Sequence, residues 1–254
     1  MSAVRNIQDY QRAYAASEFE PVQAAMRKRR LLEVLAQWRP RRILEVGCGS
    51  DALFNHHADF DRWHIVEPGE AFAAQAVRDA GGDARIHVVQ AFMEEAVPSL
   101  QDDRFDCVLL SGLLHEVPDC APLLAAVARL CTPETRVHVN VPNARSLHRL
   151  LALEMGLIAA PNEISERQRR LQQPRTFDLE TLRAVCRAGG FEVFEEGSYF
   201  VKPFTHSQMA QLQSAGILTE RMLDGLMGLE KHVSGLGSEI YVHLRPAAAA
   251  REAS

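Results

Sequence analysis

Short apolar runs and amphipathic segments alternate along most of the chain. The apolar runs predict strands at 43–46, 63–66, 85–89, 105–110, 135–141, 191–196 and 238–244. Patterns with helical period lie near 20–37, 51–57, 69–80, 119–131, 145–155 and 178–188. This alternation predicts an α/β fold, a Rossmann-like three-layer sandwich whose mostly parallel seven-stranded sheet has an antiparallel last strand and helical lid insertions. Functional residues should then gather at the carboxyl ends of the strands.

Length and composition favour a single folding unit. The 254 residues are 47% hydrophobic and 24% charged, which is enough for one sizeable α/β core. We expect one domain over 1–254. It should consist of an N-terminal helical cap (1–40), a core (41–198), a lid insertion (199–237), a last strand (238–245) and a flexible tail (246–254). The lid is expected because a parallel strand ends at the ligand edge; the alternative is a helical pair that only shields the sheet.

The first predicted strand ends in a glycine turn, within Ile43-Leu44-Glu45-Val46-Gly47-Cys48-Gly49-Ser50. Glycines at 47 and 49 allow a sharp turn and leave no Cβ between backbone and ligand. A helix expected to begin near Asp51 would direct free N–H groups to the same crevice. Another nucleotide site and a purely structural turn remain alternatives, because a lone Gly-x-Gly is weak evidence.

Two details favour a methionine-bearing nucleoside over a dinucleotide. A pyrophosphate gains nothing from a carboxylate beside it, whereas an ammonium group is well served by Glu45 or by carbonyls that it positions. The third glycine of the dinucleotide pattern is also missing, since Ala52 stands in its place.

The second strand ends in Glu67, at the distance from the glycine turn where a βαβ unit presents a carboxylate to ribose hydroxyls. The alternative is a surface Glu that caps the following helix. After the third strand, Phe92 and Met93 offer apolar surfaces against which a nucleobase could lie, although either side chain can equally belong to the core. After the fourth strand, His115 is the first candidate base for an acceptor proton, the alternative being a histidine that shapes the wall.

These segments together resemble the successive motifs of class I S-adenosylmethionine-dependent methyltransferases, in the small-molecule branch typified by ubiquinone-type enzymes. The resemblance is carried by Ile43 to Ser50, Val66-Glu67, Val89 to Phe92 and Phe105 to Ser111, and it covers roughly residues 40 to 245. It implies S-adenosyl-L-methionine as cofactor, with the methionine end at Glu45, Gly47 and Gly49, the ribose at Glu67, the adenine at Ala91 and Phe92, and the sulfonium beside Ser111. Ser50-Asp51 departs from the commoner glycine, which leaves the loop geometry open.

Candidate acceptor contacts follow the fifth and sixth strands. Asn143, His148 and Arg149 come after the fifth strand, in a region that commonly faces the acceptor in this family; Arg149 is equally a helix-surface charge. Tyr199 and Lys202 begin the lid. Helices before the first strand often close over the donor in the family, so Tyr10, Tyr14 and Phe19 are a second expected cover.

Net charge and cysteine usage limit the kinds of partner and cofactor that we expect for this chain. A net charge of −5 argues against a nucleic-acid acceptor. Arg27-Lys28-Arg29-Arg30 and Arg167-Gln168-Arg169-Arg170 form local basic patches; such patches are usually solvated helix faces, the alternative being a patch that guides an acidic or phosphorylated substrate. The five scattered cysteines indicate reduced core thiols in a cytoplasmic protein, and none has metal-ligand spacing, so no metal is expected. Without an apolar run of spanning length, no membrane partner is expected either. A homodimer is compatible with this interpretation.

Three functional hypotheses remain. The first is an enzyme that transfers a methyl group to an oxygen or nitrogen atom of a small-molecule acceptor. The second is a non-catalytic binding module that keeps the fold, motivated by the altered Ser50-Asp51 turn. The third, a nucleotide-dependent oxidoreductase, lacks its distinguishing third glycine.

Overall fold

The fold is built on one seven-stranded sheet, which places the predicted strands in a single layer. The structure, a computed structural model, describes residues 19–247. The strands are β1 (Arg42–Val46), β2 (Arg62–Val66), β3 (Ile86–Val89), β4 (Cys107–Ser111), β5 (Arg136–Pro142), β6 (Phe191–Tyr199) and β7 (Glu239–Pro246). Their order is β3-β2-β1-β4-β5-β7-β6, and only β7 is antiparallel to its neighbours. The predicted fold class is confirmed, including the antiparallel last strand.

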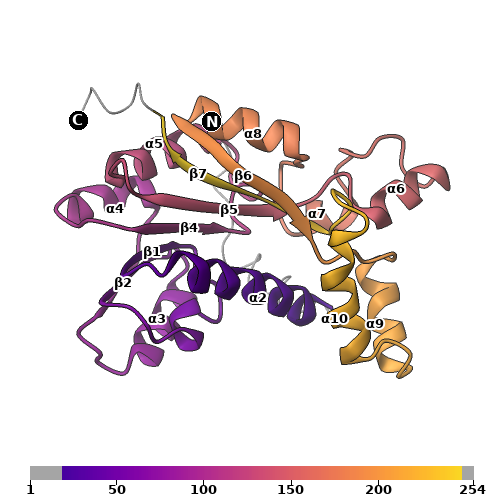
Figure 1. Cartoon of the computed structure of the whole chain (residues 1–254), viewed down its shortest axis with the longest axis horizontal. Helices are drawn as coiled ribbons and strands as arrows, with labels where there is room; N and C mark the ends of the chain where they lie inside the picture. Colours follow the sequence, from indigo (N-terminus) through magenta and orange to yellow (C-terminus); the bar gives the residue numbers. More distant parts are fainter. Residues whose placement is uncertain (1–18, 248–254) are drawn as a thin grey trace.

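Helices cover both faces of this sheet (Figure 1). They are α2 (Glu20–Trp38), η1 (Leu53–His56), α3 (Glu70–Ala80), α4 (Met93–Leu100), α5 (Cys120–Leu130), α6 (Leu147–Glu154), α7 (Glu166–Arg170), α8 (Leu179–Ala188), α9 (His206–Ser214), α10 (Glu220–Gly228) and η2 (Leu229–Lys231). One apolar layer joins the sheet to α2, η1 and α3, and the other joins it to α4, α5 and α8.

The strand sequences explain this layering. Successive side chains of a strand point to opposite faces, so both faces must be apolar in a covered parallel sheet. In β4, Leu109 packs in the layer of α2 and α3, while Val108 and Leu110 pack in the layer of α4 and α5. All three are at most 1% exposed. The central strands are therefore continuous apolar runs, as the sequence indicated.

A third apolar cluster lies at one end of the sheet. It joins Phe19 and Met26 at the start of α2 to Phe200, Met209 and Leu223 after β6. Figure 1 shows α6, α7, α9 and α10 gathered at the end where β4 and β5 finish. The segment predicted as a lid therefore packs against the start of α2 at the carboxyl edge of the sheet. Tyr10 and Tyr14 of the expected cap, and the tail beyond 247, lie outside the described residues.

The local predictions failed in three places. The helix expected over 51–57 is only the 3-10 turn η1, because the Glu45 carboxylate takes the Leu53 N–H and the Asp51 side chain bonds to Lys28 and His56. The helix α4 was not expected, since Pro98 lies inside it. The short α7 has no apolar stripe and depends on a capping box between Ser165 and Gln168.

Candidate active site

The glycine turn after β1 has the backbone conformation that its sequence requires. Gly47 and Gly49 have φ angles of 77° and 61°, which favour residues without a Cβ. The Gly47 N–H donates to the Val66 carbonyl at 2.8 Å, so the turn is anchored to β2. Apart from Gly49 itself and its two chain neighbours, no atom of the described chain lies within 4 Å of the point where a Cβ of Gly49 would stand. The outer side of the turn is therefore bare backbone, open to a ligand.

Glu67 joins this turn to the next one. Its Oε2 accepts the Gly49 N–H at 3.3 Å, and its Oε1 accepts the Gly69 N–H at 2.7 Å. The side chain is 5% exposed, and burial raises the pKa of its carboxyl above the ordinary value. The carboxylate is thus held between two strand ends, at the place where ribose hydroxyls were predicted to bind.

Glu45 lies inside the fold behind the glycine turn. Its carboxylate accepts hydrogen bonds from the Leu53 N–H at 3.2 Å and from the Trp63 indole at 3.0 Å. Burial raises the pKa of Glu45 to about 7. Of the two predicted roles, this geometry favours the indirect one, because the side chain positions the backbone of the turn.

The turn after β3 presents Ala91 and Phe92 at the same edge. The Phe92 N–H donates to the Glu95 carboxylate at 3.3 Å, which fixes the start of α4. The Phe92 side chain is 45% exposed, whereas Met93 is buried in the core. Of the two side chains considered for contact with a nucleobase, only Phe92 has an exposed ring.

The end of β4 carries Ser111, Gly112 and, a few residues on, His115. The Ser111 hydroxyl is buried and has no hydrogen-bond partner among the described residues. His115 is 4% exposed, and its Nε2 lies 3.7 Å from Glu116 Oε1, which also accepts a hydrogen bond from Gln173. A buried hydroxyl and a buried imidazole therefore follow the same strand end.

Register in the sheet brings these turns together. Val46 pairs with Val66, and Val66 with Val89, so the first three strands end side by side. Ser111 pairs with Asn140 of β5. The residues predicted for the donor thus share one edge although they come from four separate strands.

A buried polar network extends this edge towards β7, and its central residues were not predicted. Glu239 is 1% exposed and accepts hydrogen bonds from Arg27 at 2.7 Å, from Asn140 at 3.1 Å and from Gln23 at 3.2 Å. The Arg27 guanidinium lies 3.5 Å from the point where a Cβ of Gly112 would stand. The network therefore reaches the turn that follows β4.

The basic run Arg27-Lys28-Arg29-Arg30 was interpreted as a solvated helix face, which is wrong for Arg27. Residues four apart lie on one face of a helix, so Gln23 and Arg27 project together towards Glu239. Arg29 projects outwards to Asp224 of α10 at 2.6 Å. The spacing of Gln23 and Arg27 beside the apolar Met26 was the available signal, but nothing in it identifies Glu239 as the partner.

Two of the residues predicted to contact the acceptor are engaged in holding loops. The Asn143 amide donates to the carbonyls of Gly235 and Gly237 at 3.0 and 2.8 Å and accepts the Arg145 N–H at 2.9 Å. Arg149 donates to the carbonyls of Pro161 and Glu163 at 2.8 and 2.5 Å. These hydrogen bonds occupy both amide N–H groups of Asn143 and two of the five N–H donors of Arg149.

The other three predicted acceptor residues lie in or beside the third apolar cluster. Tyr199 is 3% exposed at the end of β6, and burial raises the pKa of its phenol well above the ordinary value. Lys202 is 1% exposed. The His148 Nδ1 is buried without a hydrogen-bond partner in the described chain, and burial lowers its pKa well below the usual range.

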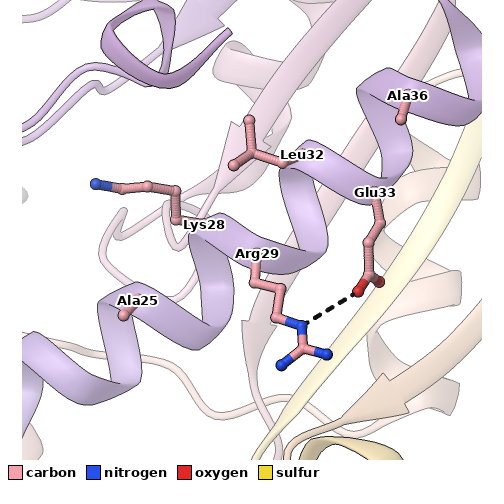
Figure 2. A pocket seen from close by; sticks show the side chains of 6 residues that line it. All are labelled: Ala25, Lys28, Arg29, Leu32, Glu33 and Ala36. Carbon is pink, nitrogen blue, oxygen red and sulfur yellow. Dashed lines mark ion pairs between the residues drawn. The ribbon is translucent and has the colours of Figure 1, made fainter. Parts of the chain in front are cut away.

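A shallow hollow on α2 lies apart from this edge (Figure 2). It is lined by Ala25, Lys28, Arg29, Leu32, Glu33 and Ala36, all from one helix. Arg29 and Glu33 form a surface ion pair at 3.5 Å across it. None of its lining residues comes from a strand end. We therefore assign the candidate site to the residues at the strand ends and not to this hollow.

Comparisons with known proteins agree with this geometry. Residues 18–196 match the family described as "Methyltransferase domain", and the chain belongs to that family. The ubiquinone biosynthesis O-methyltransferase of Paracidovorax citrulli is 26% identical over 186 residues, which cover 68% of this chain and 73% of that protein.

Solved structures share the fold at lower identity. A methyltransferase of Thermotoga maritima, described as a possible histamine N-methyltransferase, has a TM-score of 0.60 at 19% identity and covers 95% of this chain and 96% of its own. The plantazolicin methyltransferase BamL has a TM-score of 0.60 at 10% identity, with 94% and 96% of the two chains covered. The [4+2]-cyclase SpnF has a TM-score of 0.55 at 18% identity, with 89% and 82% covered.

The protein is an S-adenosylmethionine-dependent methyltransferase. The residues present fit this cofactor, since the open Gly49, the anchored Glu67 carboxylate and the unpartnered Ser111 hydroxyl share one edge. Within residues 19–247, no group of three or more His, Cys, Asp or Glu side chains is arranged to hold a metal ion. No helix in that range is both long enough and apolar enough to cross a membrane.

Proposed function

We propose that this enzyme transfers a methyl group to an oxygen or nitrogen atom of a small-molecule acceptor. The observation that carries the proposal is the continuity of one edge, where the turns after β1 to β4 meet the buried network of Arg27 and Glu239. An O-methyltransferase among the relatives supports an oxygen acceptor.

In this proposal the donor is held by strand ends. The Gly47–Gly49 turn lies against the methionine end, Glu67 accepts the ribose hydroxyls, and Ala91 with Phe92 flanks the adenine. Ser111 borders the reacting centre with its buried hydroxyl. The bound cofactor supplies an electrophilic methyl group on a sulfonium. Methyl transfer needs alignment of nucleophile, carbon and sulfur, so positioning by these turns contributes much of the acceleration.

His115 is the base of the proposed reaction. It follows β4 directly, it is buried, and its Nε2 faces the Glu116 carboxylate at 3.7 Å, which stabilises an imidazolium once a proton has been taken. A proton from a hydroxyl or amine of the acceptor would pass to this ring while the methyl group is transferred. In this proposal the acceptor lies beyond the β4 end, on the side of α6 and the segment after β6 (Figure 1).

The experiment begins with calorimetric titration of the protein with S-adenosylhomocysteine. Micromolar binding supports the donor site, and absence of binding at millimolar ligand rejects it. The protein is then incubated with S-adenosylmethionine and a panel of phenols, alcohols and amines, and products are sought by mass spectrometry as a gain of one CH₂. Donor binding without any methylated product would favour the non-catalytic binding module instead.

A further inference from the structure

Lys202 is a buried ammonium group without a carboxylate partner. It follows β6 by three residues and is 1% exposed. Its Nζ donates to His206 Nδ1 at 2.9 Å and lies 5.8 Å from the centre of the Phe19 ring. No carboxylate of the described chain pairs with it. An ammonium has three N–H donors, so a buried one with a single neutral partner is costly.

The carboxylates near Lys202 are already committed to other groups. Glu20 accepts a hydrogen bond from Arg167 at 2.6 Å and lies 3.5 Å from His206 Nε2. Although burial by itself raises the pKa of Glu20, His206 and the charges of Arg27 and Arg167 lower it well below the usual range. Glu239 is bound by Arg27. Both carboxylates are therefore engaged by partners other than Lys202.

The side chains that face Lys202 are mainly basic. Burial and the Arg167 charge, opposed by Glu20 and Glu239, together lower the pKa of Lys202 to about 7. Burial also lowers the pKa of His148, with added repulsion from Lys202 and His206. His148 comes from α6, Arg167 from α7, His206 from α9, Glu20 from α2 and Glu239 from β7.

This basic cluster is connected to the proposed reaction centre. His206 lies 3.5 Å from Glu20, and Glu20 lies 3.7 Å from Arg27. Arg27 in turn packs against Gly112 after β4. The cluster therefore lies on the acceptor side of the edge, across the Arg27–Glu239 network from Ser111.

We infer that His148, Lys202 and His206 form a subsite for an anionic group, a carboxylate or a phosphate, carried by the methyl acceptor. The inference rests on the proposed function, since it names the substrate class of the same site. An anion would accept the free N–H donors of Lys202 and supply the missing countercharge. His148, whose buried Nδ1 has no hydrogen-bond partner in the described chain, can add a further donor. His206 holds the Lys202 ammonium in place through its Nδ1.

A consequence is proton uptake on anion binding. An anion favours the charged form of Lys202, so its pKa in the complex is higher than in the free protein. At a pH between these two pKa values, Lys202 is protonated in the complex and mostly deprotonated in the free protein. Affinity for an anion should therefore be highest below about pH 7 and fall as the pH rises above it.

The experiment uses benzoate as the carboxylate probe and sulfate as a non-titrating stand-in for phosphate. The protein, saturated with S-adenosylhomocysteine, is titrated with each anion at constant ionic strength balanced by chloride. We expect binding of at least one anion, weaker by about tenfold or more at pH ~8.5 than at pH ~6. Benzoate binding alone indicates a carboxylate-bearing acceptor, and sulfate binding alone indicates a phosphorylated one.

Variants separate this subsite from general charge effects. Lys202→Met should abolish anion binding, whereas Lys231→Met removes an exposed lysine and should leave it unchanged. Lys202→Gln serves if the Met variant does not fold. Equal anion affinity in wild type and the Lys202 variants, or no binding of either anion at about 50 mM, overturns the subsite. If S-adenosylhomocysteine still binds in that case, the subsite alone fails; if it does not, the proposed function fails as well.

Discussion

The Gly49 N–H and the Glu67 carboxylate, at the ends of neighbouring strands, are joined by a hydrogen bond of 3.3 Å. The second oxygen of the same carboxylate is held by Gly69 at 2.7 Å. The distance between the glycine turn and the carboxylate proposed to hold the ribose is therefore set before any ligand binds. Such preorganisation reduces the entropy lost when a nucleoside binds.

Replacing Glu67 with Gln should weaken binding of S-adenosylhomocysteine by about 1–3 kcal/mol, because a charged hydrogen-bond acceptor is lost. Isothermal titration calorimetry measures the change. Glu70→Gln, which alters an exposed carboxylate at the start of α3, is the matched control and should leave affinity unchanged. An unaltered affinity in the Glu67 variant would show that the ribose assignment is wrong.

Replacing Gly49 with Ala should reduce donor affinity by about tenfold or more, because a Cβ would project into the space where the ligand meets the backbone. The positive φ also adds about 1–2 kcal/mol of strain. Gly82→Ala has a similar strain at φ 83° and also meets no neighbour, so thermal unfolding should show similar stability losses for both. Equal loss of donor binding in both variants would contradict a ligand beside Gly49.

Replacing His115 with Asn should lower turnover by about 100-fold, since general-base catalysis contributes at least this much, and change donor affinity little. Steady-state kinetics with the acceptor found in the panel gives the first value, and calorimetry gives the second. The acidic limb of the pH–rate profile, which reports protonation of the base, should also disappear. A parallel loss of turnover and donor affinity with an unchanged profile would assign His115 to the pocket wall.

Replacing Glu239 with Gln should destabilise the fold by about 3 kcal/mol, because it breaks a buried ion pair. Urea denaturation measures the change in free energy of unfolding. Glu192→Gln is the control on the partner strand: its pair with Arg245 is about half exposed, and its loss should cost less than about 1 kcal/mol. Similar losses in the two variants would mean that the Glu239 network is not a stabilising element.

Lys202 should make the stability of the protein depend on pH in a particular direction. Its pKa is about 7 in the folded protein, below the unfolded value, so the unfolded chain binds more protons between pH ~7 and pH ~10.5. This group therefore adds stability as the pH rises through that window. The advantage of Lys202→Met over wild type, measured by thermal unfolding, should shrink from pH ~7 to pH ~9.5. A constant difference would show that Lys202 stays protonated.

The sequence by itself determined the sheet and the edge at which the residues proposed for the donor lie. Apolar runs with strand period, glycines that tolerate positive φ, and a carboxylate at a strand end are local signals. Parallel connectivity then brings the ends of β1 to β4 to one edge, so Gly49, Glu67 and Ser111 could be placed together before the structure was known. Tertiary contacts of Glu45 and Asp51 replaced the helix expected at 51–57 by the turn η1. The short helices α4 and α7 were missed because neither has a clear helical pattern in the sequence.

The tertiary structure alone decided which charged residues are buried and paired beside that edge. Arg27 and Glu239 are 212 residues apart, and they meet because β7 inserts between β5 and β6 while α2 packs with Gln23 and Arg27 inward. The periodicity of a basic run does not predict which distant residue will pair with one of its charges. For the same reason the sequence did not show that Lys202 would be buried without a carboxylate. Burial and pairing of charges depend on contacts between distant segments, and only the packed fold specifies those contacts.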